Sequence, residues 1–237
     1  MSPLSQRLLH RHYANRPHPY RIYEGRVEKL MQPASTILDA GCGRSVPTLR
    51  KYQGRARRLI GIDLVEFRDV PPDIETYQTD LGKLPLRDSE VDLVFAQSVF
   101  EHLVDPDTVY RELFRVLRPG GAIVFLTANM WDYGTLVARM VPNRFHAKIV
   151  AKVEGRAEED TFPTAYKTNT RADVERLAGG NGLVVEEFEY LSQYPNYLMF
   201  NGALFFLGMC FEKVIHRFHM LRFLRGWILV TLRKPAG

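Results

Sequence analysis

Five short apolar runs, separated by stretches of mixed polarity, occupy the middle of the chain. They cover residues 36–40, 58–63, 74–78, 91–96 and 121–127. None of them alternates cleanly between apolar and polar positions, and this pattern is typical of strands that are buried on both faces of a sheet. The runs therefore predict five strands of one covered sheet.

A helical periodicity fills the interval between the fourth and fifth runs. Apolar residues repeat at helical spacing from Val109 to Leu117 and predict a helix over residues 105–118. Asp105 or Asp107 can cap its start, and the Pro-Gly-Gly that follows ends it. Strands and helices that alternate in this way predict a parallel, doubly wound sheet with right-handed connections.

The two ends of the chain add further elements. Pro17 and Pro19 divide residues 1–33 into two short predicted helices, because proline removes a backbone donor and disfavours helix in the residue before it. The other end predicts a helix, a strand, a long helical stretch that is first apolar and then basic, and a closing strand, at residues 170–178, 183–190, 197–218 and 227–232. Residues 131–152 predict an amphipathic flap, and residues 154–160 an exposed loop.

The composition is that of an ordinary globular protein. Of 237 residues, 46% are hydrophobic and 25% are charged, which suits one α/β domain with a sizeable core. The net charge of +5 permits a phosphate-rich or membrane-surface partner but does not require one. Cys42 and Cys210 cannot form a disulfide framework and lack zinc spacing, so we expect no metal site and a reducing, cytoplasmic setting.

Targeting segments are not expected either. The first residues carry three arginines without a continuous apolar segment, which disfavours a secretory signal. Residues 190–211 carry no charge, but serine, glutamine, proline and two asparagines interrupt the stretch. A spanning helix is more uniformly apolar, so we expect no transmembrane segment.

A glycine loop, Asp39-Ala40-Gly41-Cys42-Gly43, directly follows the first predicted strand. Its glycines allow a tight turn and a close approach to a ligand, and ligands of open α/β sheets bind beyond the carboxyl ends of the strands. The loop therefore predicts a cofactor site. Val46 stands where a dinucleotide fingerprint has its third glycine, and no Gly-Lys-Ser/Thr follows, which disfavours NAD and ATP.

Two acids follow the next two predicted strands. Asp63 comes 63 − 43 = 20 residues after Gly43 and can accept hydrogen bonds from both hydroxyls of a ribose. Asp80 can accept from an adenine amine, and the Leu81 amide can donate to a ring nitrogen. Taken alone, Asp63 is explained equally well as a helix cap or loop acid, and Asp80 better as a turn residue.

These motifs resemble, in order and spacing, those of class I S-adenosylmethionine-dependent methyltransferases, in the ubiquinone-type or methyltransferase type 11-like branch. The resemblance covers about residues 34–128 and rests on residues 39–43, 59–63, 80–86, 89–94 and 112–121. It implies an α/β fold with a Rossmann-like, doubly wound, mostly parallel seven-stranded sheet, here with a helical N-terminal cap and a C-terminal apolar and basic helix. We expect a single domain with its cap at 1–33, its cofactor half at 34–128 and its acceptor-side half at 129–237.

The resemblance also implies S-adenosylmethionine as the cofactor. The implied binding residues are Asp39, Gly41, Cys42, Gly43, Asp63, Leu64, Asp80, Leu81, Gln97 and Ser98. The glycine loop would face the methionine part, with Asp39 at its amino-acid end. Asp63 would hold the ribose, and Asp80 with Leu81 the adenine. Gln97 and Ser98 would lie where cofactor and acceptor meet.

Methyl transfer from a sulfonium mainly requires an aligned acceptor and the exclusion of water, and a hydroxyl acceptor benefits from a general base. His102 is the candidate catalytic residue, because it follows the fourth strand, titrates near neutrality and adjoins Glu101. The alternative is that Glu101 and His102 shape the loop. The sequence Ala96-Gln97-Ser98-Val99 disfavours adenine or glutamine N-methylation, and neither cysteine resembles a cytosine nucleophile.

The ends of the chain bear on the acceptor. Histidines and tyrosines among residues 10–23 could line an acceptor pocket or pack as a lid. Residues 197–225 are apolar and then basic, as interfacial helices are, and predict peripheral membrane contact, or else a helix packed on the sheet. A basic cluster over residues 44–58 could bind RNA, but no nucleic-acid module accompanies it, so nucleic acid is not an expected partner.

The sequence therefore predicts an S-adenosylmethionine-dependent methyltransferase, a monomer or dimer. Its acceptor would be a small molecule or a lipid- or saccharide-linked one, methylated on oxygen rather than nitrogen or carbon. Two alternatives stay open: a non-catalytic protein that binds the cofactor and regulates another methyltransferase, and an RNA methyltransferase. The cofactor motifs indicate binding in each case and do not separate them.

Overall fold

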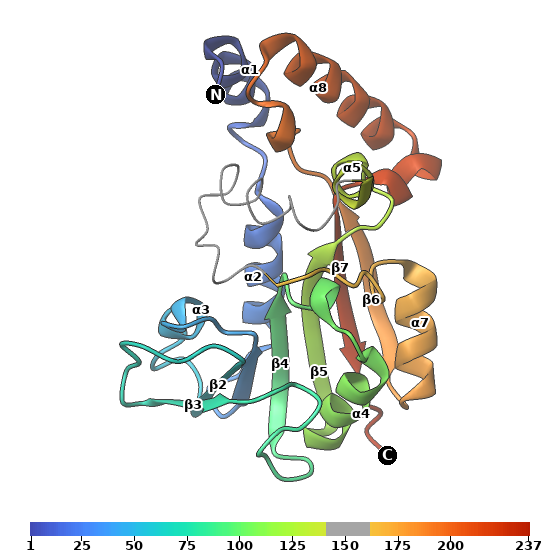
Figure 1. Cartoon of the computed structure of the whole chain (residues 1–237). Coiled ribbons are helices and arrows are strands. Elements are labelled where there is room, and N and C mark those ends of the chain that lie inside the picture. The colour runs from blue at the N-terminus through green and yellow to red at the C-terminus, as the bar shows by residue number, and fades with distance from the viewer. Residues whose placement is uncertain (141–161) are drawn as a thin grey trace. The chain divides into compact units, whose positions relative to one another are not determined.

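The computed structural model describes residues 1–140 and 162–237 and has one seven-stranded sheet at its centre. The strand order is β3-β2-β1-β4-β5-β7-β6 (Figure 1). The strands are β1 Thr36–Ala40, β2 Arg58–Asp63, β3 Ile74–Gln78, β4 Val91–Gln97, β5 Leu117–Ala128, β6 Val184–Leu191 and β7 Trp227–Arg233. Each of them corresponds to a predicted strand.

Most of the sheet is parallel. β1 pairs in parallel with β2 and β4, β2 with β3, and β4 with β5. β7 is antiparallel to β5. Gly120 N–H donates to Lys234 O and Lys234 N–H donates to Gly121 O, and at the other end of the pair Asn129 N–H donates to Gly226 O. The order reverses between β1 and β4, and such a reversal is where ligands bind in open α/β sheets. The predicted doubly wound α/β fold is confirmed.

The helices beside the sheet begin at the predicted type of capping residue. Helix α4 (Pro106–Val116) starts at Asp105, whose carboxylate accepts from Thr108 N–H at 3.3 Å. Helix α7 (Arg171–Gly180) starts at Thr170, whose hydroxyl accepts from the N–H of Asp173 at 3.1 Å. α4 ends before the predicted Arg118, because Leu117 is already extended and begins β5.

The chain forms two compact units. The sheet unit consists of Tyr23–Thr127, Thr164–Glu189 and Leu229–Gly237. The helical unit consists of Met1–Ile22, Ala128–Pro163 and Tyr190–Ile228. The core of the sheet unit is built on β1, β4 and β5, whose residues are buried on both faces as the apolar runs predicted. The short elements α3 (Pro47–Arg50) and η1 (Phe100–His102) also belong to the sheet unit.

The helical unit contains α1 (Pro3–Tyr13), α5 (Tyr133–Met140), η3 (Asn196–Leu198), α8 (Gly202–Arg217) and η4 (His219–Leu224). Helix α1 packs closely on the start of α8, where a Cβ on Gly202 would lie 2.7 Å from the side chain of Leu4. Helix α2 (Pro19–Leu30) begins in this unit and continues into the sheet unit. Within the described ranges, no helix combines the length and the apolar character needed to cross a membrane.

The long tail helix predicted over residues 197–218 is wrong at its start. The turn η3 comes first, and α8 begins only at Gly202. The side chain of Asn201 accepts from the N–H groups of Ala203 and Leu204, at 3.0 and 3.2 Å, and so caps a new helix. The two short helices predicted for residues 1–33 are confirmed. Helix α5 covers the start of the predicted flap, and its remainder and the predicted loop 154–160 lie outside the described residues.

Candidate active site

The glycine loop after β1 closes over the end of β2. The N–H groups of Gly41 and Cys42 both donate to Ile62 O, at 2.7 and 3.1 Å. Gly41 and Gly43 have φ angles of +85° and +72°, which glycine adopts without strain. A Cβ on Gly41 would lie 2.2 Å from Cγ2 of Val99, so this position has no room for a side chain.

Asp63 anchors this loop through its side chain. Oδ2 accepts from Gly43 N–H at 2.7 Å, while Oδ1 accepts from Leu64 N–H at 2.7 Å and Val65 N–H at 3.2 Å. A carboxylate offers about four acceptor sites, so at least one stays available to a hydroxyl. Asp63 is half-buried, and the side chain of Leu64 beside it is exposed. The carboxylate can therefore hold the loop and a ligand together.

Asp39 lies at the end of β1 in a buried cluster. Burial, with the charge of Asp63, raises the pKa of Asp39 well above its usual range, and burial also raises the pKa of the Cys42 thiol. The hydroxyls of Tyr23 on α2 and Tyr52 are buried near this carboxylate and have no hydrogen-bond partner among the described residues. The cluster thus offers several hydrogen-bonding groups that the protein itself does not use.

The turn after β3 is shaped by Asp80. Its Oδ1 accepts from Gly82 N–H at 2.7 Å, which is the turn role that the isolated aspartate suggested. Asp80 is exposed, and the side chain of Leu81 is buried. Both residues lie at the same edge of the sheet as the glycine loop, because β1, β2 and β3 are parallel.

The end of β4 brings Gln97 and Ser98 to this edge as well. Ser98 has a φ of +56°, and its N–H donates to Leu126 O at 2.9 Å. Its hydroxyl is buried without a hydrogen-bond partner among the described residues. A strained residue at the end of a central strand, with an unused hydroxyl, is typical of a ligand site.

The turn η1 follows, and Glu101 fixes it to the rest of the unit. Glu101 is buried, and its Oε2 accepts from the Thr127 hydroxyl at 2.6 Å. Its backbone O accepts from Ala165 N–H at 2.8 Å and Tyr166 N–H at 3.0 Å. These bonds hold the segment after residue 163 against the end of β4. His102 ends the same turn, half-exposed, with its N–H donating to Val99 O at 2.9 Å.

Sequence reasoning missed four residues of this region: Gly61, Val99, Tyr23 and Tyr52. A Cβ on Gly61 would lie 2.7 Å from Sγ of Cys42, so β2 must carry glycine there for the loop to pack. A glycine inside an apolar strand pattern signals such a close approach and could have been recognised. No local pattern marks the other three, because only the fold brings their side chains to the loop.

The residues at this edge fit S-adenosylmethionine, a nucleoside with an amino-acid tail. Asp63 keeps at least one acceptor site for a ribose hydroxyl. Three buried hydroxyls, those of Tyr23, Tyr52 and Ser98, lack partners among the described residues. The glycine loop lets a ligand approach the backbone closely. Buried polar groups are normally hydrogen-bonded, so these unused groups indicate a bound polar molecule.

Comparisons with known proteins agree with this reading. A family model described as a methyltransferase domain matches residues 38–125. A probable S-adenosylmethionine-dependent methyltransferase of Mycolicibacterium smegmatis is 36% identical over 118 residues, which are 47% of this chain and 45% of that protein. The malonyl-[acyl-carrier protein] O-methyltransferase of Serratia marcescens is 33% identical over 100 residues, 40% of this chain and 39% of that protein. The chain thus spans less than half the length of these relatives.

A solved structure extends the likeness to the whole fold. It is a chain from the complex between the Haloferax volcanii Trm112 methyltransferase activator and a methyltransferase, with a TM-score of 0.63 at 17% identity, over 98% of this chain and 93% of that chain. The match over residues 38–125 confirms the predicted resemblance to S-adenosylmethionine-dependent methyltransferases for that part of the chain. Residues 38–125 thus carry a methyltransferase domain.

Proposed function

We propose that this chain transfers the methyl group of S-adenosylmethionine to an oxygen of a small or lipid- or saccharide-linked acceptor. The cofactor, when bound, supplies a methyl group already activated by positive sulfur. The protein has to bind the cofactor, orient the acceptor and exclude water. The observation that carries the proposal is the glycine loop, which Asp63 anchors beside buried hydroxyls without partners.

The binding roles follow from the groups that remain unused. Asp63 accepts from the ribose, with Leu64 beside it, and Asp80 with the Leu81 N–H binds the adenine. The backbone of Gly41, Cys42 and Gly43 lies along the methionine part, with Asp39 near its amino-acid end. Gln97 and Ser98 border the methyl group. Tyr23 and Tyr52 supply the buried hydroxyls closest to Asp39.

The acceptor oxygen must lose a proton as the new carbon–oxygen bond forms and the carbon–sulfur bond breaks. His102 takes that proton in our proposal, because its half-exposed imidazole ends the turn that follows β4. Glu101 does not act as a second base, since its carboxylate is buried and bonded to Thr127. The O-methyltransferase of Serratia marcescens among the relatives supports oxygen as the acceptor atom.

A cavity in the helical unit supports an acceptor of limited size. Its volume is about 450 Å³, within the range of small-molecule pockets. Tyr13, His18 and Tyr194 line it, with ring centroids 6.1 Å apart for the two tyrosines and 6.5 Å apart for His18 and Tyr194. Aromatic and histidine side chains of the first segment therefore line a pocket, which favours the acceptor-pocket interpretation of that segment.

A lipid-linked acceptor would be reached at a membrane surface. The apolar and basic residues 197–225 support peripheral membrane contact, because exposed apolar side chains and cations alternate there. Such contact would place the chain where a lipid-linked acceptor is concentrated.

The RNA alternative is disfavoured by the pairing of the basic cluster. Four of its cations form ion pairs within the sheet unit: Arg50 with Asp69, Lys51 with Glu24, Arg55 with Glu28, and Arg58 with Glu75 and Glu90. RNA binding depends on cations that are free to neutralise phosphates. Paired cations provide little of that charge.

Cofactor binding is the first property to test. We expect Asp63→Ala to weaken S-adenosylmethionine binding by about 30-fold or more, because it removes charge-assisted hydrogen bonds to both the loop and the ribose. Isothermal calorimetry measures the affinity. Asp73→Ala is the matched control, since Asp73 precedes β3 at the opposite edge and bonds only an exposed Gln53 side chain. No binding by folded wild-type chain would refute the proposed function.

The His102 role is tested by kinetics, which also separates an enzyme from a non-catalytic binding protein. Wild-type chain should form S-adenosylhomocysteine when acceptor mixtures are added, and the best acceptor should be used for rates. We expect His102→Gln to lower kcat by about 10²-fold or more, with cofactor affinity unchanged. An unchanged kcat would assign His102 to shaping the turn.

A further inference from the structure

Helix α8 carries an apolar stripe on its exposed side. Leu204, Leu207, Phe211, Val214 and Phe218 follow one another at spacings of three and four residues, so they share one face. Their side chains are between 38% and 61% exposed. A helix of a globular unit normally turns such a stripe toward its core. This stripe faces outward instead.

The opposite face of α8 already packs into the helical unit. Phe205, Met209 and Ile215 are at most 2% exposed. The core of the unit therefore has its own apolar residues from this helix, and within the stripe Phe211 also contacts the ring of Tyr133, with centroids 5.8 Å apart. The stripe is a second apolar face on the same helix.

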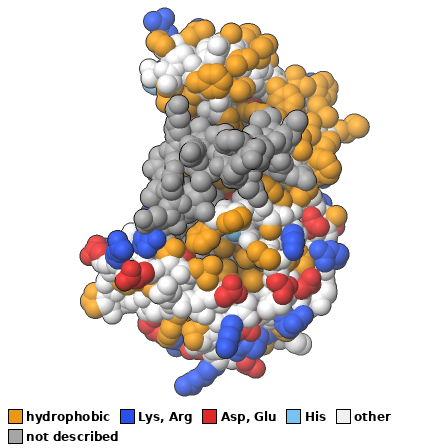
Figure 2. Space-filling model, viewed as in Figure 1, with side chains coloured by type: hydrophobic (Ala, Val, Ile, Leu, Met, Phe, Trp, Pro, Cys, Tyr) orange, Lys and Arg blue, Asp and Glu red, His pale blue; other side chains and the backbone are white. Residues whose placement is uncertain are grey.

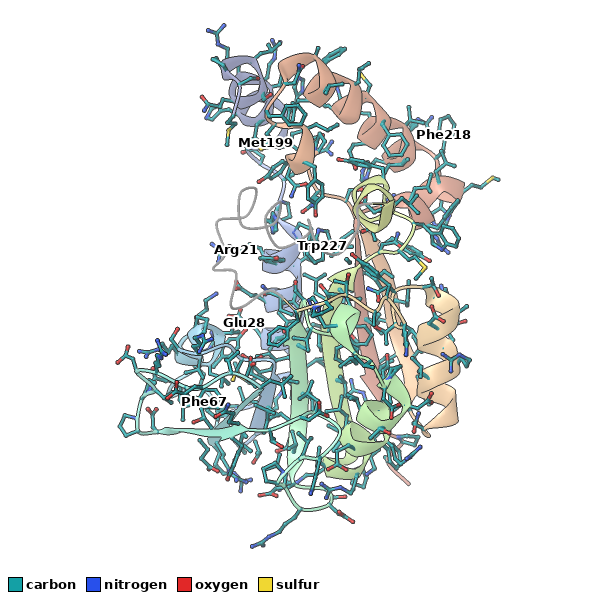
Figure 3. The ribbon with its side chains drawn as sticks, viewed as in Figure 1. Arg21, Glu28, Phe67, Met199, Phe218 and Trp227 are labelled. Carbon is teal, nitrogen blue, oxygen red and sulfur yellow. The ribbon has the colours of Figure 1, made fainter. Side chains whose placement is uncertain are left out.

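The exposed apolar area continues beyond α8. In η4, Met220 is 86% exposed, and Phe223 is exposed as well. Figure 2 shows hydrophobic side chains gathered over α8 and the segment that follows it, and Figure 3 labels Phe218 at the end of the helix. Among the described residues, every exposed large hydrophobic side chain belongs to the helical unit except Leu64, Val104 and Val184. The feature is concentrated in one unit.

The charges around this surface have one sign. The exposed lysine and arginine side chains of the described helical unit are Arg7, Arg11, Arg16, Arg21, Lys213 and Arg217. The acids in the described part of the same unit, Asp132 and Glu212, are both buried. Lys213 and Arg217 are on α8 itself. The exposed charge of the described unit is therefore positive.

We propose that this surface docks on an anionic lipid bilayer. We name it the α8 surface: the five stripe residues, Met220 and Phe223, together with the exposed cations Lys213 and Arg217 of the same helix. The apolar side chains enter the boundary between headgroups and acyl chains, and the cations stay at the level of the anionic headgroups. The contact is peripheral. It is argued from the helical unit alone and holds whether or not the chain methylates a lipid.

A second copy of the chain is a poorer occupant of the α8 surface. Two copies that met through it would bring together two helical units whose exposed described charges are all positive. Like charges brought together in a desolvated interface are costly. An anionic bilayer neutralises the same cations. The positive charge of the helical unit therefore favours an anionic bilayer over a second copy of the chain.

Vesicle flotation with the full chain tests the proposal. The vesicles are phosphatidylcholine alone, and phosphatidylcholine with phosphatidylglycerol. We expect flotation with the anionic vesicles at low salt and reduced flotation at high salt, since the screening length falls from about 10 Å at 0.1 M to about 3 Å at 1 M. Neutral vesicles should bind much less. Equal flotation with both kinds would overturn the assignment of an anionic surface.

Two variants locate the contact. Leu207→Glu places a charge in the middle of the stripe and should lower the bound fraction about tenfold or more. Val184→Glu is the matched control, because Val184 is 55% exposed on β6 in the sheet unit, and it should bind as wild type. Equal melting temperatures and cofactor affinities show that both variants are folded.

Other results would overturn the proposal. Wild-type chain that stays with the unbound fraction at low salt would do so, and so would Leu207→Glu that floats as well as wild type. Sedimentation velocity tests whether a second copy of the chain occupies the α8 surface instead. A dimer that Leu207→Glu dissociates, without any vesicle binding by wild type, would assign the α8 surface to self-association. None of these results depends on methyl transfer, so they are distinct from failure of the proposed function.

Discussion

Gly41→Ala is expected to remove measurable binding of S-adenosylmethionine while the chain stays folded. The added Cβ would lie 2.2 Å from Cγ2 of Val99, and a φ of +85° is strained for any L side chain. The loop can relieve the overlap only by moving away from β4, and the same loop is anchored by Asp63. A shift of about 1 Å costs on the order of 100-fold in a positioned site, so calorimetry should find at least that loss of affinity.

Two further variants separate the effect of backbone strain from the effect of the overlap with Val99. Gly54→Ala has the same kind of backbone strain, with a φ of +72°, but nothing lies within 4 Å of its Cβ. It should lose some stability and keep its cofactor affinity. The double variant Gly41→Ala/Val99→Ala removes most of the overlap and should recover part of the binding. Wild-type affinity in Gly41→Ala would show that the loop is not held as described.

Glu212→Gln is expected to stabilise the helical unit at alkaline pH. Glu212 on α8 is 4% exposed, and its Oε2 has no hydrogen-bond partner among the described residues. Burial raises the pKa of Glu212 to about 8, and the charge of Asp132 adds to the rise, while the Ser192 hydroxyl and the charges of Arg225 and Arg16 oppose it. Glutamine keeps the shape of the side chain without a charge to bury.

The direction of the pH effect follows from the raised pKa. The folded chain binds the Glu212 proton more tightly than the unfolded chain, whose carboxyl has the ordinary pKa of 4.5. Stability is therefore fully present below the unfolded pKa and is lost as pH rises toward 8. Asp132, with its pKa raised by burial to about 6, acts in the same direction over a lower range. Loss of about 2–4 kcal/mol is expected from Glu212.

Tryptophan fluorescence is the suitable measurement, because Trp131 and Trp227 both belong to the helical unit. Thermal unfolding at about pH 5 and about pH 8.5 should show a lower Tm at the higher pH for wild type, and a much smaller difference for Glu212→Gln. Glu175→Gln is the control. Glu175 is an exposed residue of α7 that pairs with Arg171, and its loss should leave the pH dependence as in wild type. The same pH dependence in Glu212→Gln would contradict the assignment.

The strands and most helix starts could be predicted because short stretches of sequence, the apolar runs and the capping residues, determine them. Residues 36–40 and 91–97 are apolar on both faces, and Asp105 and Thr170 are strong caps. The division of the tail at Asn201 was not predicted, because apolar residues continue on both sides of this cap. The division into two units could not be predicted from the sequence either. Each unit joins three distant segments, which no local pattern marks.

The candidate site divides in the same way. Gly41, Gly43 and Asp63 were predicted from spacing, and in the structure Gly43 N–H donates to Asp63 Oδ2. Tyr23 and Val99 reach the loop from α2 and from the end of β4, so only tertiary structure could place them. The burial of Glu101 and its bond to Thr127 likewise depend on two strand ends meeting. Pairs that are distant in sequence were the part that could not be predicted.

The place of β7 in the sheet has a consequence for synthesis. β7 follows β6 along the chain but lies between β5 and β6 in the strand order. While a ribosome is still making residues 227–233, β5 has an open edge and β6 has no neighbour on that side. Open strand edges pair with other chains, so the nascent protein has to be shielded or remain unpaired until residues 227–233 have been made. The sheet therefore cannot close between β5 and β6 before β7 is available.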